Sequence, residues 1–246
     1  MFKRKIRNPH YQLVAEATAF LLTLVIISTL WPSHLISNLV SFALVVTAFY
    51  FFHTREDIIF FTVAALLGTL GEIIVIKFGA WQYTHPFIAG VPLWLLILWG
   101  FSLIMVRRAR DVVFQLKHRA IHYYRHPSFA KFKSALIFDF SVYILTVFLV
   151  ATLWPNNTAL FLSLITLLFI QIFRTHHKDG YFFIAAAAIF GPFAEFIGTQ
   201  AGAWTYANPS LLGLPIWLPL LYASFIFGTR NLTATITTYL YGREDR

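Results

Sequence analysis

One motif occurs twice in this chain, 123 residues apart. Residues 68–95 read GTLGEIIVIKFGAWQYTHPFIAGVPLWL, and residues 191–218 read GPFAEFIGTQAGAWTYANPSLLGLPIWL. A shift of 123 positions aligns the copies without a gap. A fixed period of this kind has to be interpreted before any fold is proposed. Identical pairs include Gly68 and Gly191, Glu72 and Glu195, Gly79 and Gly202, Trp81 and Trp204, Tyr83 and Tyr206, Pro86 and Pro209, Gly90 and Gly213, Pro92 and Pro215, and Trp94 and Trp217.

Eight apolar stretches accompany the motif, each close to the roughly 17–25 residues that a membrane-spanning helix needs. The chain is 59% hydrophobic and only 12% charged, with a mean hydropathy of +0.70, which is typical of multi-pass membrane proteins. The stretches cover residues 9–31, 34–53, 57–79, 91–106, 134–154, 157–174, 180–202 and 214–229.

The 123-residue period extends beyond the motif, because Trp31-Pro32 matches Trp154-Pro155. Each repeat therefore contains four helices, and an even number of helices returns the chain to its starting side. We expect an all-α integral membrane protein with eight transmembrane helices, built as two parallel four-helix repeats about a pseudo-two-fold axis along the membrane normal. The predicted units are residues 1–108, a basic linker over residues 109–133, and residues 134–246.

The net charge of +9 indicates the orientation in the membrane. With the N-terminus in the cytoplasm, every Lys and Arg except Lys77 lies on the inner side, as the positive-inside rule requires. We therefore expect a plasma (inner) membrane protein with both termini cytoplasmic, and no nucleic-acid partner. The basic linker is either a helix lying on anionic lipid or a solvated connection.

Four acidic residues fall within predicted spans, and an ionisable group at bilayer depth usually marks function. Glu72 and Glu195 share helix faces with glycines, so they should point into the bundle and are our candidate catalytic residues. Glu16 and Asp139, which are equivalent under the shift, are secondary acidic candidates. Since Lys77 could pair with Glu72, we expect Glu195 to be the acid that acts in chemistry.

The aromatic residues of the motif are candidates for contacts with a substrate. Their alternative role is to mark helix ends and the membrane interface, as Gly, Pro and Trp do in many membrane proteins. The six candidates are Trp81, Tyr83, Trp204, Tyr206, Trp94 and Trp217.

No metal or cofactor is expected. The chain has no cysteine, and His53 and His176 are not part of an HxxxH or HExxH pair. Neither a phosphate-binding loop nor a dinucleotide fingerprint occurs.

The order of Glu, Gly-x-Trp-x-Tyr and Gly-x-Pro resembles motifs of membrane enzymes of carotenoid biosynthesis. The acyclic carotenoid hydratase family is similar at Glu72, Gly79, Trp81 and Tyr83, at Gly90-Val91-Pro92, and at Trp99. Small membrane lycopene cyclases are similar at Gly202, Trp204 and Tyr206, but this chain has Trp94-Leu95 and Trp217-Leu218 in place of their Glu-Glu pair.

That resemblance implies an enzyme that acts on a polyisoprenoid such as a carotenoid. Glu72 or Glu195 would then be a general acid towards a C=C bond, and the ring faces of the motif would stabilise the cation. Two alternatives remain open: a proton- or cation-coupled transporter or channel for a small solute, and a membrane scaffold without chemistry. A membrane lipid or a hydrophobic isoprenoid is the expected partner, and the residues predict no oligomeric state.

Overall fold

The computed structural model describes residues 9–52, 55–117, 129–175 and 180–241. Within these ranges the chain forms eight α-helices and two short strands. They are α1 (Pro9–Leu30), α2 (His34–Phe52), α3 (Arg55–Lys77), β1 (Trp81–Tyr83), α4 (Trp94–Lys117), α5 (Phe129–Leu153), α6 (Asn157–Thr175), α7 (Gly180–Gln200), β2 (Trp204–Tyr206) and α8 (Leu218–Tyr241).

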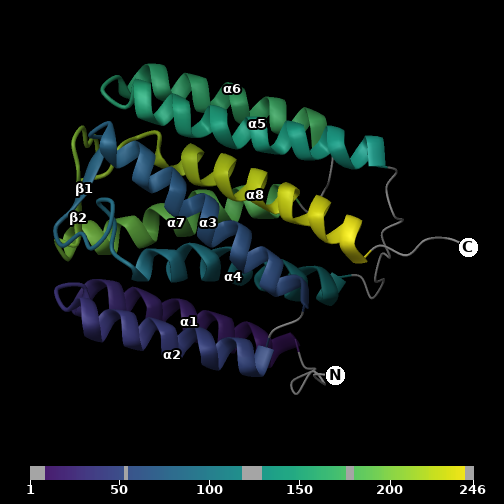
Figure 1. The fold of residues 1–246 in the computed structure, drawn as a ribbon, viewed down its shortest axis with the longest axis horizontal. Helices are drawn as coiled ribbons and strands as arrows, with labels where there is room; N and C mark the ends of the chain where they lie inside the picture. Colours follow the sequence, from purple (N-terminus) through teal and green to yellow (C-terminus); the bar gives the residue numbers. More distant parts are fainter. Residues whose placement is uncertain (1–8, 53–54, 118–128, 176–179, 242–246) are drawn as a thin grey trace, which may run out of the picture.

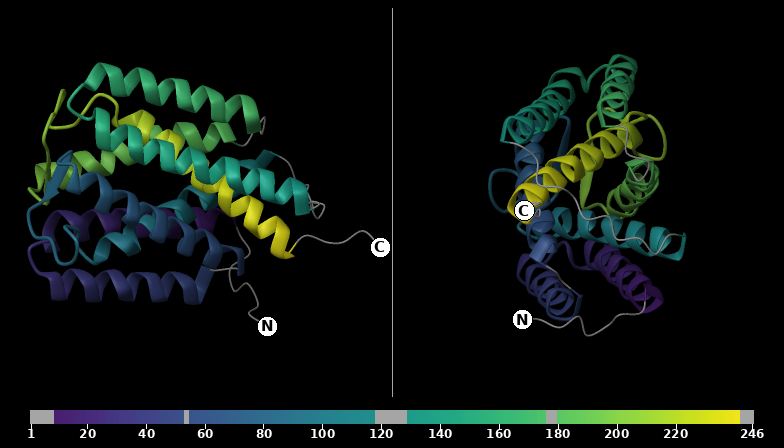
Figure 2. Two further views of the ribbon diagram at one scale, coloured as in Figure 1. Left: turned by 45° about the horizontal axis from the view of Figure 1, so that its top comes forward. Right: turned by 90° about the vertical axis from the view of Figure 1, so that its right-hand side faces the viewer.

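The helices lie side by side in one bundle, and both strands lie at the same end of it (Figure 1). The odd-numbered helices run towards the strands and the even-numbered helices run away from them. Two hairpins, α1–α2 and α5–α6, flank the four remaining helices on opposite sides, as the end-on view in Figure 2 confirms.

Four helices are long and apolar enough to cross a membrane, namely Asp57–Lys77, Phe129–Leu153, Asn157–Arg174 and Gly180–Gln200. Two shorter apolar segments, Ala17–Leu30 and His34–Thr47, lie in α1 and α2. Many large apolar side chains on these helices are exposed, for example Leu70 on α3 and Phe148 on α5. Such surfaces are stable against lipid and not against water. The chain is a helical integral membrane protein.

The 123-residue period recurs in the element bounds and in the packing. The shift carries α2 onto α6 and β1 onto β2 residue for residue. The helix pairs in contact also correspond: α1–α4 with α5–α8, α3–α4 with α7–α8, and α1–α7 with α3–α5. The last correspondence shows that the first helix of each copy packs on the third helix of the other.

The two strands pair antiparallel, with Trp81 opposite Tyr206 and Tyr83 opposite Trp204. Each strand follows a glycine that ends the preceding helix in the left-handed conformation, Gly79 with φ +83° and Gly202 with φ +78°. A side chain would be strained there, which explains the repeated Gly before each aromatic triplet. The largest hydrophobic core cluster lies beneath the strands and includes Trp81, Tyr83, Trp204 and Tyr206.

Three helices extend well beyond the predicted apolar stretches. We predicted a span over residues 91–106, but α4 continues to Lys117; α8 continues to Tyr241 instead of residue 229, and α5 begins at Phe129 instead of residue 134. Hydropathy detects only the part of a helix that lies in hydrocarbon, whereas the backbone hydrogen bonds continue past it. The predicted linker thus contributes its ends to α4 and α5, and residues 118–128 lie outside the described residues.

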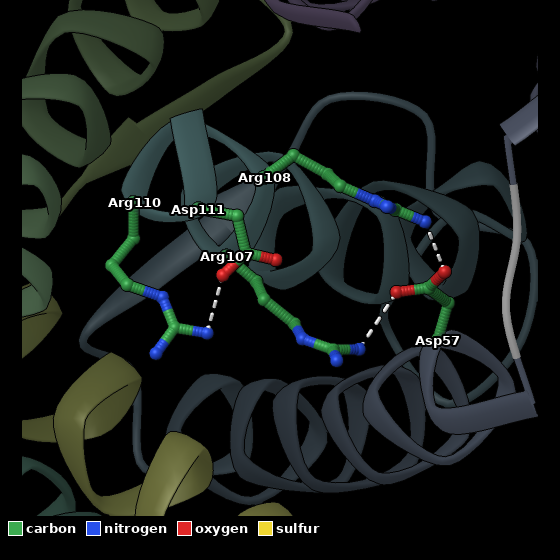
Figure 3. A network of polar contacts seen from close by, with 5 residues as sticks. All are labelled: Asp57, Arg107, Arg108, Arg110 and Asp111. Carbon is green, nitrogen blue, oxygen red and sulfur yellow. Dashed lines mark hydrogen bonds and ion pairs between the residues drawn. The ribbon is translucent and has the colours of Figure 1, made fainter. Parts of the chain in front are cut away.

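Ion pairs between helices hold the polar end of α4 in place (Figure 3). Asp57, at the start of α3, bonds Arg107 through Oδ1 at 2.7 Å and Arg108 through Oδ2. Asp57 is 1% exposed, so this network is buried. Arg110 and Asp111, one turn further along α4, pair with each other at 2.6 Å.

Candidate functional site

Glu72 lies on α3, seven residues before the glycine that ends the helix. Its side chain is buried, and both of its hydrogen bonds reach Oε2: the indole N–H of Trp81 donates at 2.7 Å and the hydroxyl of Tyr83 at 3.4 Å. Lys77 is exposed at the end of α3 and does not pair with Glu72, in contrast to the expected ion pair. The carboxylate instead joins α3 to the strand that follows it.

Glu195 repeats this arrangement on α7 with one additional donor. Its Oε2 accepts from the indole N–H of Trp204 at 2.6 Å and from the hydroxyl of Tyr206 at 2.8 Å. Its Oε1 accepts from the hydroxyl of Tyr222, on α8, at 2.5 Å. Both oxygens of Glu195 are therefore engaged, whereas Glu72 has a donor on one oxygen only.

The two carboxylates are joined through their aromatic donors. Trp81 packs on Tyr206 with ring centroids 5.5 Å apart, and Tyr83 packs on Trp204 at 5.6 Å. The antiparallel register produces both contacts, because it places each Trp opposite the Tyr of the other copy. The two copies of the motif thus form one site at the strand end of the bundle, and neither is complete alone.

The phenol groups of the strands act as hydrogen-bond donors in this site. Burial, and then the charges of the neighbouring carboxylates, raises the pKa of Tyr83 and of Tyr206 well above the usual range for tyrosine. Both hydroxyls consequently keep their protons, and the indole N–H groups can only donate. All of these donors point at glutamate oxygens.

Trp99 and Tyr222 are equivalent under the 123-residue shift but differ in the hydrogen bond that they offer to the glutamate of their copy. Their rings stack on each other, with centroids 5.6 Å apart and an interplanar angle of 19°. Each ring lies against a glycine of the preceding helix, Trp99 on Gly68 and Tyr222 on Gly191, where an added Cβ would clash. Tyr222 bonds Glu195, whereas the buried Nε1 of Trp99 faces Glu72 without reaching hydrogen-bond geometry.

Sequence reasoning used Trp99 only as part of a resemblance and missed Tyr222 as a donor. The signal that could have found both was the alignment of Trp99 with Tyr222, which places two hydrogen-bonding aromatics opposite the two glutamates.

A cavity of about 50 Å³ lies beside Glu72. Residues of α3, α4, α5 and α8 line it, together with Trp81 of β1. Glu72 and Trp99 are on its wall, and most of the remaining surface is apolar, including Val147, Val150 and Phe225. The side chains of Glu72 and Trp99 are therefore next to an apolar space.

The other sequence candidates lie at the edges of this site or away from it. Trp94 and Trp217 are buried at the starts of α4 and α8, where Trp94 contacts Tyr83 and Trp217 contacts Tyr206. Asp139 is buried on α5, away from these contacts, and accepts one long bond of 3.4 Å from Thr235.

Three candidates cannot be placed in full. Glu16 falls on α1, but its side chain lies outside the described part of the structure. His53 and His176 lie outside the described residues altogether. In the described part of the chain, no three His, Asp or Glu side chains gather as a metal site would require.

Known proteins match this chain in their structure and not in their sequence. No family model and no curated protein matches the sequence. A cross-linked trimer of MvINS matches with a TM-score of 0.61 and 17% identity, covering 78% of this chain and 98% of that one. The mycobacterial Insig homologue MvINS from Mycobacterium vanbaalenii matches with a TM-score of 0.58 and 18% identity, covering 74% and 93%. The chain has an Insig-like fold.

This finding corrects the resemblance to carotenoid hydratases and lycopene cyclases. The similar structures are Insig homologues, and nothing links the chain to a carotenoid enzyme. The residue types shared with those enzymes were Gly, Pro, Trp and Tyr at helix ends. In this fold these residues form the two turns and donate hydrogen bonds to Glu72 and Glu195, so sharing them did not identify an enzymatic activity.

Proposed function

We propose that the protein is a membrane-embedded binding protein for an amphiphilic, lipid-like ligand, whose hydroxyl group binds between Glu72 and Trp99. The supporting observation is the apolar cavity lined by Glu72, whose hydrogen bonds reach one oxygen only, and by Trp99, whose buried N–H faces Glu72 without reaching hydrogen-bond geometry. A hydroxyl group can donate to the first and accept from the second, so it satisfies both. A buried polar group without a partner costs about 1–3 kcal/mol, which favours a ligand that supplies the missing bonds.

The second copy supports the choice of a hydroxyl group. There the phenol hydroxyl of Tyr222 donates to Oε1 of Glu195 at 2.5 Å. In the first copy the equivalent residue is Trp99, which faces Glu72 without reaching hydrogen-bond geometry, so the hydrogen bonds to Glu72 in the described residues all go to Oε2. The ligand would therefore supply at Glu72 the group that the chain itself supplies at Glu195.

The size and surroundings of the cavity support a ligand with an apolar tail. A volume of about 50 Å³ holds a small polar head and the first carbons of a chain, and no more. Gly71 and Val147 line the cavity where α3 packs on α5, and the exposed Leu70, Ile74 and Phe148 flank that contact. An apolar tail leaving between these helices would lie in the lipid.

We propose that the bundle crosses the membrane eight times as two parallel four-helix repeats. The common direction of equivalent helices and their matched packing support this arrangement. The absence of Lys and Arg from residues 78–106 and 201–229 supports an outer location for the strands and cytoplasmic termini in the plasma membrane. The cross-linked MvINS trimer supports an oligomer of this chain as well.

A photoactivatable long-chain alcohol tests the proposed function, with its methyl ether as the matched probe that cannot donate. We expect the alcohol to label α3 and α5 residues around the cavity of the full chain in nanodiscs, and the ether to label them about tenfold less, as one hydrogen bond to a charged group predicts. Glu72→Gln should reduce labelling by the alcohol to the level of the ether, and Glu195→Gln should not.

Equal labelling by alcohol and ether, or labelling that is the same in wild type and Glu72→Gln, would contradict the proposed function.

A further inference from the structure

We infer that the loop over residues 84–91, which follows β1, opens on acidification while its counterpart over residues 207–214 stays closed. The two loops are equivalent under the 123-residue shift and adopt the same turn, with Ala89 and Leu212 both at φ 52°. They differ in the side chains that attach them to the rest of the fold. His34 and His85 occupy the positions that Asn157 and Asn208 occupy in the second copy.

The second loop is held by hydrogen bonds from groups that do not titrate. Nδ2 of Asn157 donates to the hydroxyl of Ser210 at 2.8 Å, and Oδ1 of Asn157 accepts from Trp217 at 2.8 Å. Nδ2 of Asn208 donates to the carbonyl of Pro155 at 2.9 Å. These bonds join the loop to the turn between α5 and α6 at any pH that the protein withstands.

The first loop is held by ring contacts and by one hydrogen bond from a group that does not titrate, from the Thr84 hydroxyl to the carbonyl of Gly202. The His34 and His85 rings meet edge to face with centroids 6.2 Å apart, Phe87 lies 5.6 Å from His34, and Trp31 lies 5.3 Å from His85. The ring contacts of the two imidazoles are thus with each other, with an indole and with a phenyl ring, and His85 is also exposed to solvent. Within the described chain, neither histidine forms an ion pair with a carboxylate.

Nδ1 of His34 is buried and has no hydrogen-bond partner. A neutral imidazole tolerates this when its proton is on the other nitrogen, because only a lone pair is then left unused. A protonated imidazole carries N–H on both nitrogens, and the second N–H has no acceptor in the closed loop. Two imidazolium groups about 6 Å apart would also repel each other.

Histidine is the side chain whose charge ordinarily changes between pH 5 and 8. A second N–H on this ring therefore favours a conformation in which Nδ1 of the half-buried His34 leaves its packing and reaches water. The loop begins directly after Tyr83, a donor to Glu72, so opening would loosen the strand that holds this donor and ease ligand exchange at Glu72. This consequence for ligand exchange rests on the proposed function, whereas the change in the loop does not.

Hydrogen–deuterium exchange on the full chain in nanodiscs tests the inference without any ligand. The amides of Phe87 and Ile88 donate to Val91 O, and the amides of Ser210 and Leu211 donate to Leu214 O, so each loop carries its own reporter. After correction for intrinsic exchange rates, we expect protection of residues 84–91 to fall about tenfold or more from pH 7.5 to pH 5.5. Protection of residues 207–214 should remain constant.

Two variants locate the effect. The double variant His34→Asn, His85→Asn should lose the pH dependence of the first loop, and the reverse double variant Asn157→His, Asn208→His should confer it on the second. Constant protection of residues 84–91 in the wild type would overturn the inference, whether or not the variants fold. An equal loss of protection in both loops would overturn it too, because the effect would then not come from the histidines.

Discussion

Replacing each glutamate by glutamine should destabilise the protein unequally, with the larger loss at Glu195. Glutamine keeps the shape of the side chain but turns one acceptor oxygen into an N–H₂ donor. At Glu195 the change affects three short hydrogen bonds, from Trp204, Tyr206 and Tyr222. At Glu72 it affects one short bond and one of 3.4 Å.

The expected losses follow from the number and length of these bonds. A buried group left without its hydrogen bond costs about 1–3 kcal/mol, so an acceptor oxygen that becomes a donor costs about 1 kcal/mol for each short bond it affects. The free energy of unfolding should fall by about 3 kcal/mol for Glu195→Gln and about 1 kcal/mol for Glu72→Gln. In a chain of this size, the 2 kcal/mol between them corresponds to about 4–8 °C in Tm.

Thermal melting of both variants in the same detergent measures this difference, and denaturant titration gives the free energy independently. The pair of Lys77 with Glu72 that the sequence allows would predict the opposite, because Glu72→Gln would then leave Lys77 unpaired. A larger loss for Glu72→Gln, or equal melting temperatures, would refute the reasoning from the hydrogen bonds.

Two further pairs of variants test the packing and the ion pairs, and a third experiment tests the topology. Gly191→Ala should cost about 1–3 kcal/mol, because its Cβ would lie 2.2 Å from the Tyr222 ring, whereas Gly71→Ala has room and should cost little in melting experiments. Asp57→Asn should cost about 3–5 kcal/mol, since it leaves two arginines at a buried site, and the more exposed Asp111→Asn under about 1 kcal/mol. Reporters inserted after Pro86 and after Lys117 should lie on opposite sides of the membrane; a shared side would contradict the eight-span proposal.

Much of the architecture was predictable, because lipid imposes strong constraints on a sequence. The helical class and the membrane location are confirmed, and most helix ends near the strands were found within a few residues. The eight spans, the two-repeat organisation and the orientation stay predictions. The inner ends of α4 and α8 were missed because their polar residues, such as Arg108, are stabilised by a partner on another helix. Such a partner has no local signature in the sequence.

The sequence predicted which residues form the site but not how they contact one another. The period identified the paired glutamates and aromatics, and it could have identified Trp99 with Tyr222. The antiparallel register that joins Trp81 to Tyr206 depends on how the copies meet, which the period alone does not determine. The catalytic role of Glu72 and Glu195, the transporter alternative and the roles of Glu16 and Asp139 stay predictions.

The central claim is that Glu72 is open to a ligand hydroxyl because Trp99 stands where the second copy has Tyr222. The direct test is Trp99→Tyr, which gives Glu72 the same phenol donor that Glu195 has. Labelling by the photoactivatable alcohol should fall to the level of its methyl ether, while the melting temperature stays the same or rises. Wild-type labelling in a correctly folded Trp99→Tyr variant would contradict the claim.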